Sequence, residues 1–266
     1  MIAPVPGLLA SLFYLCATVV HGQALARNRD RRQLLLGLAG AGLLLHLWQV
    51  VLAIHTEGGY DFSFFRIATL FSWVMVAIVL AGSLRKPLEN LLLVILPIAI
   101  LGILSSTFFG STRAIASDLG AGVALHSILG IVAFSLITIA AVQALLVAWL
   151  SRELKQHHFR PALRHMPPLQ TMESLLFSII HSGFIVLLAV IVSGFVFMDD
   201  MFAQHLVHKT GLTLFSCVVF GILLWGRHVK GWRGRKALWW ILIGYAVLLL
   251  AYFGSKFVLE LLLHRV

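Results

Sequence analysis

The stretch GAGVALHSILGIVAFSL, residues 120–136, decides the fold because it opens an apolar run that continues to about residue 151. A helix needs about 20 mostly apolar residues to cross the hydrocarbon layer of a membrane. One ionisable side chain, His126, lies at the start of this run. An imidazole in that position needs water or a polar partner. The residues around His126 are therefore the first place to look for a function.

Similar apolar windows follow one another along the whole chain. Of its 266 residues, 60% are hydrophobic and 11% are charged, and the mean hydropathy is +0.98, which is typical of a membrane protein. We predict membrane-spanning helices at residues 4–26, 33–55, 62–83, 89–109, 122–151, 172–198, 207–227 and 237–263. The expected fold class is an all-α integral membrane protein, a bundle of about eight transmembrane helices that forms a single domain over residues 1–266.

The basic residues indicate how these helices are oriented. Fifteen of the 20 Lys and Arg residues follow the first, third, fifth or seventh predicted helix. Since loops rich in Lys and Arg stay in the cytoplasm, both termini are expected to be periplasmic, in a bacterial inner membrane. The same loops account for the net charge of +10, so the expected partner is the lipid bilayer and no nucleic acid is expected.

Histidines gather on the predicted periplasmic side. His126 begins the fifth predicted helix and His264 ends the eighth, while His55, His205 and His208 lie in or beside the outer loops. His46 differs, because it lies near the middle of the second helix, where an ionisable side chain is costly and marks a candidate functional site. His181, in the sixth helix, lies within roughly 6 Å of the same depth at 1.5 Å per residue.

Four stretches resemble the heme-handling membrane proteins of cytochrome c assembly. They are LHLWQVVLAIHTEGGYDFSFFRIATLFSWV (45–74), LHSILGIVAFSLITIAAVQAL (125–145), GWRGRKALWW (231–240) and LLLAYFGSKF (248–257). The first holds a histidine, an outer loop and a closing FxSW, the third is similar to a GWxGKR turn, and the fourth is similar to a YFG helix. Within the family, the chain resembles a shorter subgroup of eight-span inner-membrane proteins.

The resemblance implies a non-covalently bound b-type heme. By that likeness, His126 and His264 are the expected ligands of the heme iron, with His205, His208 or His55 as substitutes for His264. His46 and His181 are candidates for a second bis-histidine site inside the membrane. Arg66, Arg113 and Lys209 are candidate partners of the heme propionates, although ordinary snorkelling to the interface also explains cations at those depths.

One departure from the family concerns heme delivery. Members that hand heme to an apocytochrome carry a tryptophan-rich segment in an outer loop, whereas the corresponding stretch here, MDDMFAQHLVHKTG (198–211), contains no tryptophan. The resemblance therefore implies heme handling without that presenting loop. Other cytochrome assembly proteins are the implied protein partners.

Other functions remain open from the sequence alone. A scaffold or regulator of tetrapyrrole or cytochrome biogenesis would act through basic cytoplasmic loops such as residues 151–170. A small-solute transporter is disfavoured because coupled carriers usually hold carboxylates near the membrane centre, and each Asp and Glu here lies at or near the end of a predicted helix. Catalysis is not expected, because the chain contains neither a nucleotide-binding glycine loop nor HExxH.

Overall fold

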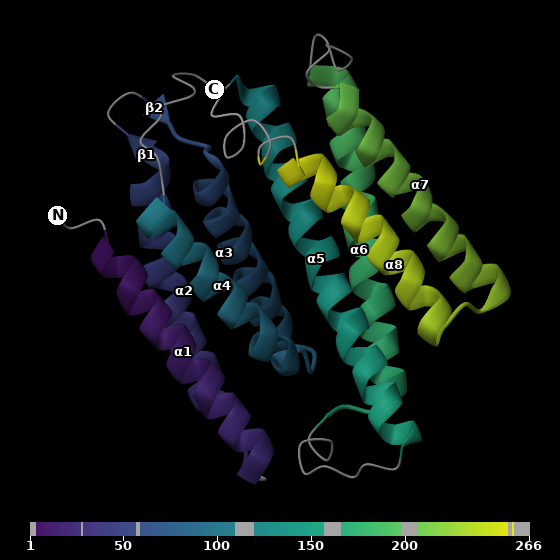
Figure 1. Cartoon of the computed structure of the whole chain (residues 1–266), viewed down its shortest axis with the longest axis horizontal. Helices are drawn as coiled ribbons and strands as arrows, with labels where there is room; N and C mark the ends of the chain where they lie inside the picture. The colour runs from purple at the N-terminus through teal and green to yellow at the C-terminus, as the bar shows by residue number, and fades with distance from the viewer. Residues whose placement is uncertain are drawn as a thin grey trace. The chain divides into compact units, whose positions relative to one another are not determined.

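The computed structural model describes residues 4–27, 29–56, 59–109, 120–156, 166–197, 207–254 and 257. Across these residues the protein is helical, with eight helices that are long and apolar enough to cross a membrane (Figure 1). They are α1 Pro4–Arg27, α2 Arg32–Ile54, α3 Phe64–Ser83, α4 Glu89–Phe109, α5 Ala121–Lys155, α6 Leu169–Phe197, α7 Val207–Lys230 and α8 Gly234–Leu249. The predicted all-α membrane fold and its eight helices are confirmed.

Helix boundaries differ most from the prediction where the chain leaves the apolar layer. Helix α5 continues to Lys155 and α6 begins at Leu169, so both extend beyond the predicted 122–151 and 172–198. Arg152, Glu153 and Lys155 are polar but favour helix, so the helix does not end where the apolar run ends. Beyond α8, a short π-helix, η2, covers Leu250–Gly254. Between α2 and α3, strands β1 (His55–Thr56) and β2 (Gly59–Tyr60) form an antiparallel pair.

The chain divides into two compact units, each with four of the helices. Unit 1 comprises residues 1–118 and 158–167, and unit 2 comprises residues 119–157 and 168–266. The predicted single domain over residues 1–266 stays a prediction, and each unit is described by itself.

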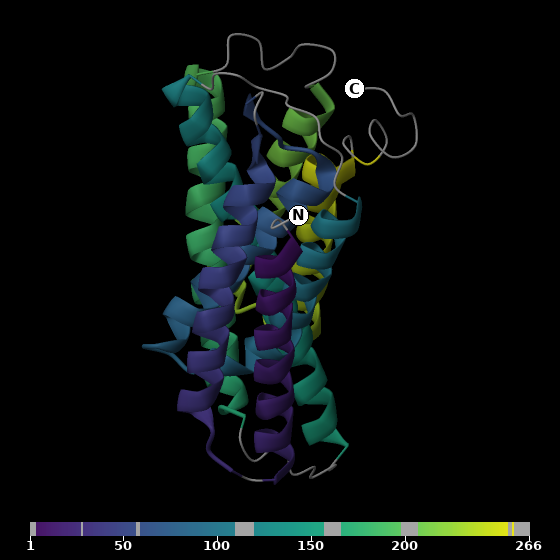
Figure 2. The same cartoon turned by 90° about the vertical axis from the view of Figure 1, so that its left-hand side faces the viewer.

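In unit 1, α1 packs against both α2 and α4, and α3 packs against both α2 and α4. Figure 2 shows α1 and α2 running side by side. Small residues allow this close packing: a Cβ on Gly42 would lie 2.6 Å from the ring of Tyr14, and one on Gly102 would lie 2.7 Å from Ser72 Oγ. Close approach of this kind drives helix association in lipid.

Unit 2 is built in the same way, with α5 against α6 and α8, and α7 against α6 and α8. The α7–α8 turn contains two glycines with positive φ, Gly231 at 64° and Gly234 at 55°, a backbone conformation that glycine adopts without steric cost. The amide of Trp232 bonds the Gly226 carbonyl at 3.1 Å, and the indole of Trp232 stacks on Trp240 at 5.5 Å. The spacing of the glycines in GWRGRK is therefore that of a tight helix-to-helix turn.

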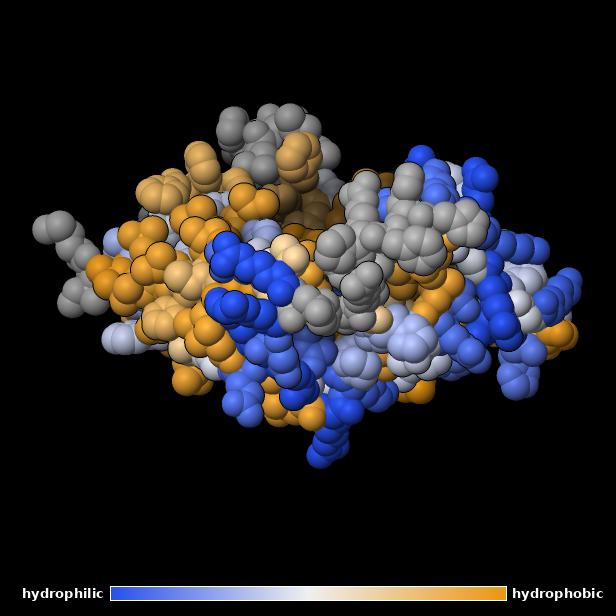
Figure 3. Space-filling model, turned by 90° about the horizontal axis from the view of Figure 1, so that it is seen from below, coloured by the Kyte–Doolittle hydropathy of each residue, from blue (hydrophilic) through white to orange (hydrophobic). Residues whose placement is uncertain are grey.

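The helix surfaces are suited to lipid. Large apolar side chains point outward along the helices, among them Leu44, Leu101 and Ile185, which are 70%, 67% and 64% exposed. Soluble monomers rarely expose so many large apolar side chains side by side. Figure 3 looks onto one end of the molecule, where hydrophilic residues gather among the apolar ones.

Candidate functional site: two histidines in different settings

His46 lies in the core of unit 1 and is fully buried. Both of its ring nitrogens have partners: Nδ1 lies 3.3 Å from the hydroxyl of Tyr14 on α1, and Nε2 lies 3.0 Å from Thr69 Oγ1 on α3. A neutral imidazole has one N–H donor and one acceptor nitrogen. The Thr69 hydroxyl donates its proton to Gln49 Oε1, so it accepts from His46 Nε2–H, and the Tyr14 hydroxyl donates to Nδ1.

The partners of His46 belong to a polar network that joins all four helices of unit 1. Thr69 Oγ1 lies 3.4 Å from Gln49 Oε1, and Gln49 Nε2 lies 3.5 Å from Ser106 Oγ on α4. Buried polar groups in a membrane-spanning bundle are costly unless they are satisfied. The network satisfies His46 within unit 1, and this arrangement leaves neither ring nitrogen open to a metal.

Arg66, in the first turn of α3, connects this helix to the end of α2 and to the segment after the β-hairpin through a hydrogen bond and an ion pair. It is 8% exposed, its guanidinium lies 3.2 Å from the carboxylate of Asp61, and it donates a hydrogen bond to the carbonyl of Ala53. Asp61 is fully buried and also accepts a bond from the Ser63 amide at 2.8 Å. The charge of Arg66 is thus already compensated by a buried acid, which weakens its case as a propionate partner.

His126 has a different environment in unit 2. It lies in the second turn of α5 and is half-buried, with Nδ1 3.0 Å from Ser193 Oγ on α6. The Ser193 hydroxyl donates to the Val190 carbonyl, also at 3.0 Å, so its oxygen is the acceptor toward His126. The imidazole therefore carries its proton on Nδ1, and Nε2 keeps a lone pair.

A histidine held through Nδ1–H with an unprotonated Nε2 is the arrangement that metal-ligating histidines adopt. Glycines let α5 and α6 pack closely on both sides of this contact along the helices. A Cβ on Gly122 would lie 2.5 Å from the ring of Phe197, and one on Gly183 would lie 3.0 Å from Ile137. An imidazole held in this way could serve as an axial ligand of a heme iron.

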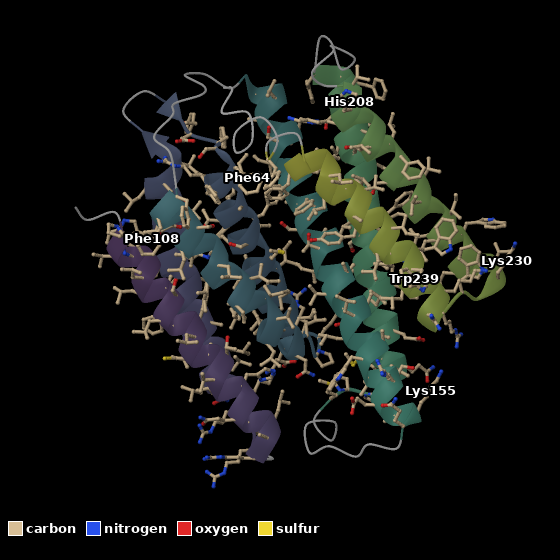
Figure 4. The ribbon with its side chains drawn as sticks, viewed as in Figure 1. Phe64, Phe108, Lys155, His208, Lys230 and Trp239 are labelled. Atoms are coloured by element: carbon tan, nitrogen blue, oxygen red, sulfur yellow. The ribbon has the colours of Figure 1, made fainter. Side chains whose placement is uncertain are left out.

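Lys209 and His208 lie in the first turn of α7, at the end of unit 2 where α5 begins and α6 ends. In Figure 4 the labelled His208 marks this end, and the labelled Lys155 and Lys230 mark the other. Lys209 is half-buried and His208 is exposed. Lys209 therefore lies at the same end of unit 2 as His126, where a ligand with acidic groups would meet it.

His181, in the middle of α6, donates from Nδ1 to the Phe177 carbonyl of its own helix at 2.7 Å. Its side chain is exposed, and the proton on Nδ1 again leaves Nε2 as an acceptor. His46 and His181 belong to different units. A second bis-histidine site built from them stays a prediction, and the two occupied nitrogens of His46 do not support it.

Some predicted residues lie outside the part of the chain that the structure describes. His264 and His205 are among them, as is Arg113. Within the described residues, no group of three or more His, Cys, Asp or Glu side chains could hold a metal ion. This result does not bear on a heme, whose iron needs only one or two axial histidines from the protein.

The sequence analysis did not single out the residues that hold these histidines. Tyr14, Thr69 and Ser193 are polar side chains inside apolar windows, which is itself a signal, because such residues usually bond across helices. Their pairing with particular histidines depends on the contacts between helices, which periodicity does not provide.

Comparisons with known proteins agree with this architecture. The family described as "Cytochrome C assembly protein" matches residues 35–263. The chain is 28% identical over 263 residues to "Inner membrane protein YpjD" of Escherichia coli strain K12, which covers 97% of this chain and 99% of that protein. It is also 34% identical over 146 residues to "Uncharacterized 28.8 kDa protein in nifR3-like 5'region" of Azospirillum brasilense, 54% of each chain.

No solved structure matches the chain. The family match covers most of the sequence, including most of α2, all of α3 to α8 and the stretches that carry His46, His126 and His181. The chain therefore belongs to the cytochrome c assembly protein family.

Proposed function

We propose that this protein binds a b-type heme non-covalently at the end of unit 2 where α5 begins, with His126 as an axial ligand of the iron. In this role it receives, holds or passes on heme, and it carries out no catalytic chemistry of its own. The observation that carries the proposal is the hydrogen bond between His126 Nδ1 and Ser193 Oγ. That bond sets the tautomer in which Nε2 can donate its lone pair to iron.

The remaining contacts with heme are assigned by position. His264 is our candidate for the second axial ligand, and Lys209, at the same end of unit 2 as His126, is our candidate for a propionate. A Lys or Arg beside a carboxylate forms a charge-assisted hydrogen bond. Heme itself supplies the iron, while the protein contributes an oriented imidazole, a positive charge and a setting of low polarity.

We further propose that the protein lies in a bacterial inner membrane with both termini in the periplasm. Basic residues support this orientation, since Arg27, Arg85, Lys155 and Lys230 each lie at or just beyond the C-terminal end of an odd-numbered helix. Loops with such residues are retained in the cytoplasm. His126 would then face the periplasm, the compartment in which c-type cytochromes are assembled.

The test is an absorption spectrum of the full chain, purified in detergent, before and after addition of heme. We expect a Soret band that His126→Ala reduces, together with a heme dissociation constant raised by at least about 10-fold, because even second-shell changes cost metal sites that much. His228→Ala is the matched control, since His228 is an exposed histidine in the last turn of α7, at the opposite end of unit 2.

Imidazole rescue separates ligation from folding. If His126 binds iron, His126→Gly should recover the Soret band when imidazole is added, because the free ring occupies the vacated position. A protein that gives no Soret band after heme addition contradicts the proposal, as does a spectrum that His126→Ala leaves unchanged.

A further inference from the structure

A cavity of about 640 Å³ lies in unit 2 at the end opposite to His126. Its walls come from the last turns of α5 and the first turns of α6 and α8, including Ser151, Arg152 and Lys155 of α5, Glu173 of α6 and Arg235 of α8. The volume falls within the range of sites for small ligands. Neither the family likeness nor the heme proposal uses this cavity.

The mouth of the cavity is positively charged. Arg152, Lys155 and Arg235 contribute three cations, against the single carboxylate of Glu173. All three cations are exposed, and the salt bridges among the described residues, Arg32–Glu89 and Arg66–Asp61, include none of them. Three cations around one opening attract an anion.

The interior of the same cavity is apolar. Val147 of α5, Phe177 of α6 and Ala237 of α8 line it and are buried. Small side chains make the room, because Ala144 and Ala148 lie one turn apart on α5 and both line the cavity. An occupant must therefore combine an anionic group at the mouth with an apolar part inside.

The position of the cavity selects among such occupants. Its cations lie at the ends of membrane-spanning helices, and Figure 4 shows the labelled Lys155 at the end of α5, a level at which lipid headgroups lie. Basic pockets between helices at this level bind anionic headgroups. Heme is also an apolar dianion, but the lining residues that the structure describes include no His, Cys, Met or Tyr, so these residues offer its iron no axial ligand.

We propose that this cavity binds one anionic phospholipid. The phosphodiester lies against Arg152, Lys155 and Arg235, with the Ser151 hydroxyl and the Gln156 amide as further donors, and an acyl chain lies along the alanines of α5. Arginine suits this role because its guanidinium bonds two phosphate oxygens at once. The lipid then bridges α5 and α8 at the end of unit 2 where the positive-inside rule places the cytoplasm.

The test is native mass spectrometry of the full chain in detergent, titrated with phosphatidylglycerol or with phosphatidylcholine. The wild type should retain phosphatidylglycerol in preference. Arg152→Gln/Arg235→Gln should weaken phosphatidylglycerol binding by about 30-fold, since each basic residue contributes about fivefold to binding an anionic headgroup. Arg85→Gln/Lys230→Gln removes the same charge from the same side of the membrane but outside the cavity, and it should bind like the wild type.

A second variant tests the apolar part. Ala148→Phe keeps every cation and fills the space beside Phe177, so it should lower phosphatidylglycerol retention without altering the elution profile of the purified protein. Heme spectra of all variants should match that of the wild type, so a failure of the heme proposal leaves this test intact.

Three results obtained without heme would overturn the lipid proposal. They are equal retention of the two lipids by the wild type, an equal loss in the Arg85/Lys230 control, and full displacement of the lipid by millimolar inorganic phosphate, which would identify a site for a small anion instead. Displacement of the lipid by heme would also overturn it.

Discussion

Replacing His46 by leucine tests whether this buried histidine stabilises unit 1 or binds a cofactor. The change removes both ring nitrogens and puts an apolar side chain in their place in the core. Thr69 keeps its contact with Gln49 at 3.4 Å, whereas the Tyr14 hydroxyl loses His46, its hydrogen-bond partner among the described residues. We therefore expect a loss of stability and an unchanged heme spectrum.

The size of the effect follows from counting the polar groups left without partners. An unsatisfied buried hydroxyl costs about 1–3 kcal/mol, so His46→Leu should lower the free energy of unfolding by that amount. Tyr14→Phe leaves a histidine nitrogen unsatisfied and removes one bond, for a cost of about 0.6–1.7 kcal/mol. In the double variant neither orphan remains, so its cost should fall short of the sum by about 0.5–1.5 kcal/mol.

Reversible unfolding in mixed detergent micelles measures these free energies, with heme spectra recorded on the same preparations. Leu44→Ala is the control, because Leu44 is 70% exposed on the outer face of α2 and should have little effect. If the losses of unfolding free energy in the two single variants add up to that of the double variant within about 0.3 kcal/mol, the bond between Tyr14 and His46 is refuted. Loss of a heme band in His46→Leu with no loss of stability would show instead that His46 is a ligand.

Three other changes have expected outcomes. Ser193→Ala removes the acceptor of His126 Nδ1–H and should raise the heme dissociation constant by about 10- to 100-fold, measured by Soret titration. Asp61→Asn leaves the buried Arg66 without its compensating charge and should lower the free energy of unfolding by about 3–5 kcal/mol. Gly42→Ala puts a Cβ 2.6 Å from the facing tyrosine ring and should cost about 1–3 kcal/mol in the same unfolding assay. Gly37→Ala is the control for Gly42→Ala: no atom lies within 4 Å of the added Cβ, so it should be neutral or slightly stabilising.

Two further controls make these outcomes specific. Ser182→Ala removes a hydroxyl that donates to its own helix at Ser178, so heme binding should not change, and an equal loss in both serine variants would exclude the tautomer argument. Glu89→Gln breaks an ion pair with Arg32, whose side chain is 46% exposed. Exposed pairs contribute little, so a loss as large as that of Asp61→Asn would contradict the role of burial.

The helices themselves could be predicted from the sequence because long apolar windows in a membrane have a single solution, a helix with internally paired backbone groups. Their ends were less predictable, since Arg152 to Lys155 favour helix after the apolar run has ended. The division into two four-helix units was not predicted. It depends on which helix faces touch, and Gly42 against Tyr14 or Gly183 against Ile137 are contacts between helices that no single window contains.

The histidines of the candidate site could be predicted from the sequence, but their hydrogen-bond partners could not. His46 and His126 are both histidines in apolar helices, and position alone ranked His46 as a strong functional candidate. Their difference lies in their side-chain partners: His46 has a hydroxyl on each nitrogen, whereas the side-chain hydrogen bond of His126 is at Nδ1. Because one proton is shared between two ring nitrogens, a ring held at one of them presents a defined lone pair at the other. A ring held at both nitrogens connects two helices instead.

His181 shares the hydrogen-bond pattern of His126, since its Nδ1 bonds the Phe177 carbonyl. If a second heme site exists in the membrane, His181→Ala should therefore change iron binding more than His46→Leu does. A spectrum that responds to His46→Leu and not to His181→Ala would reverse this order and the reasoning from partners that produced it.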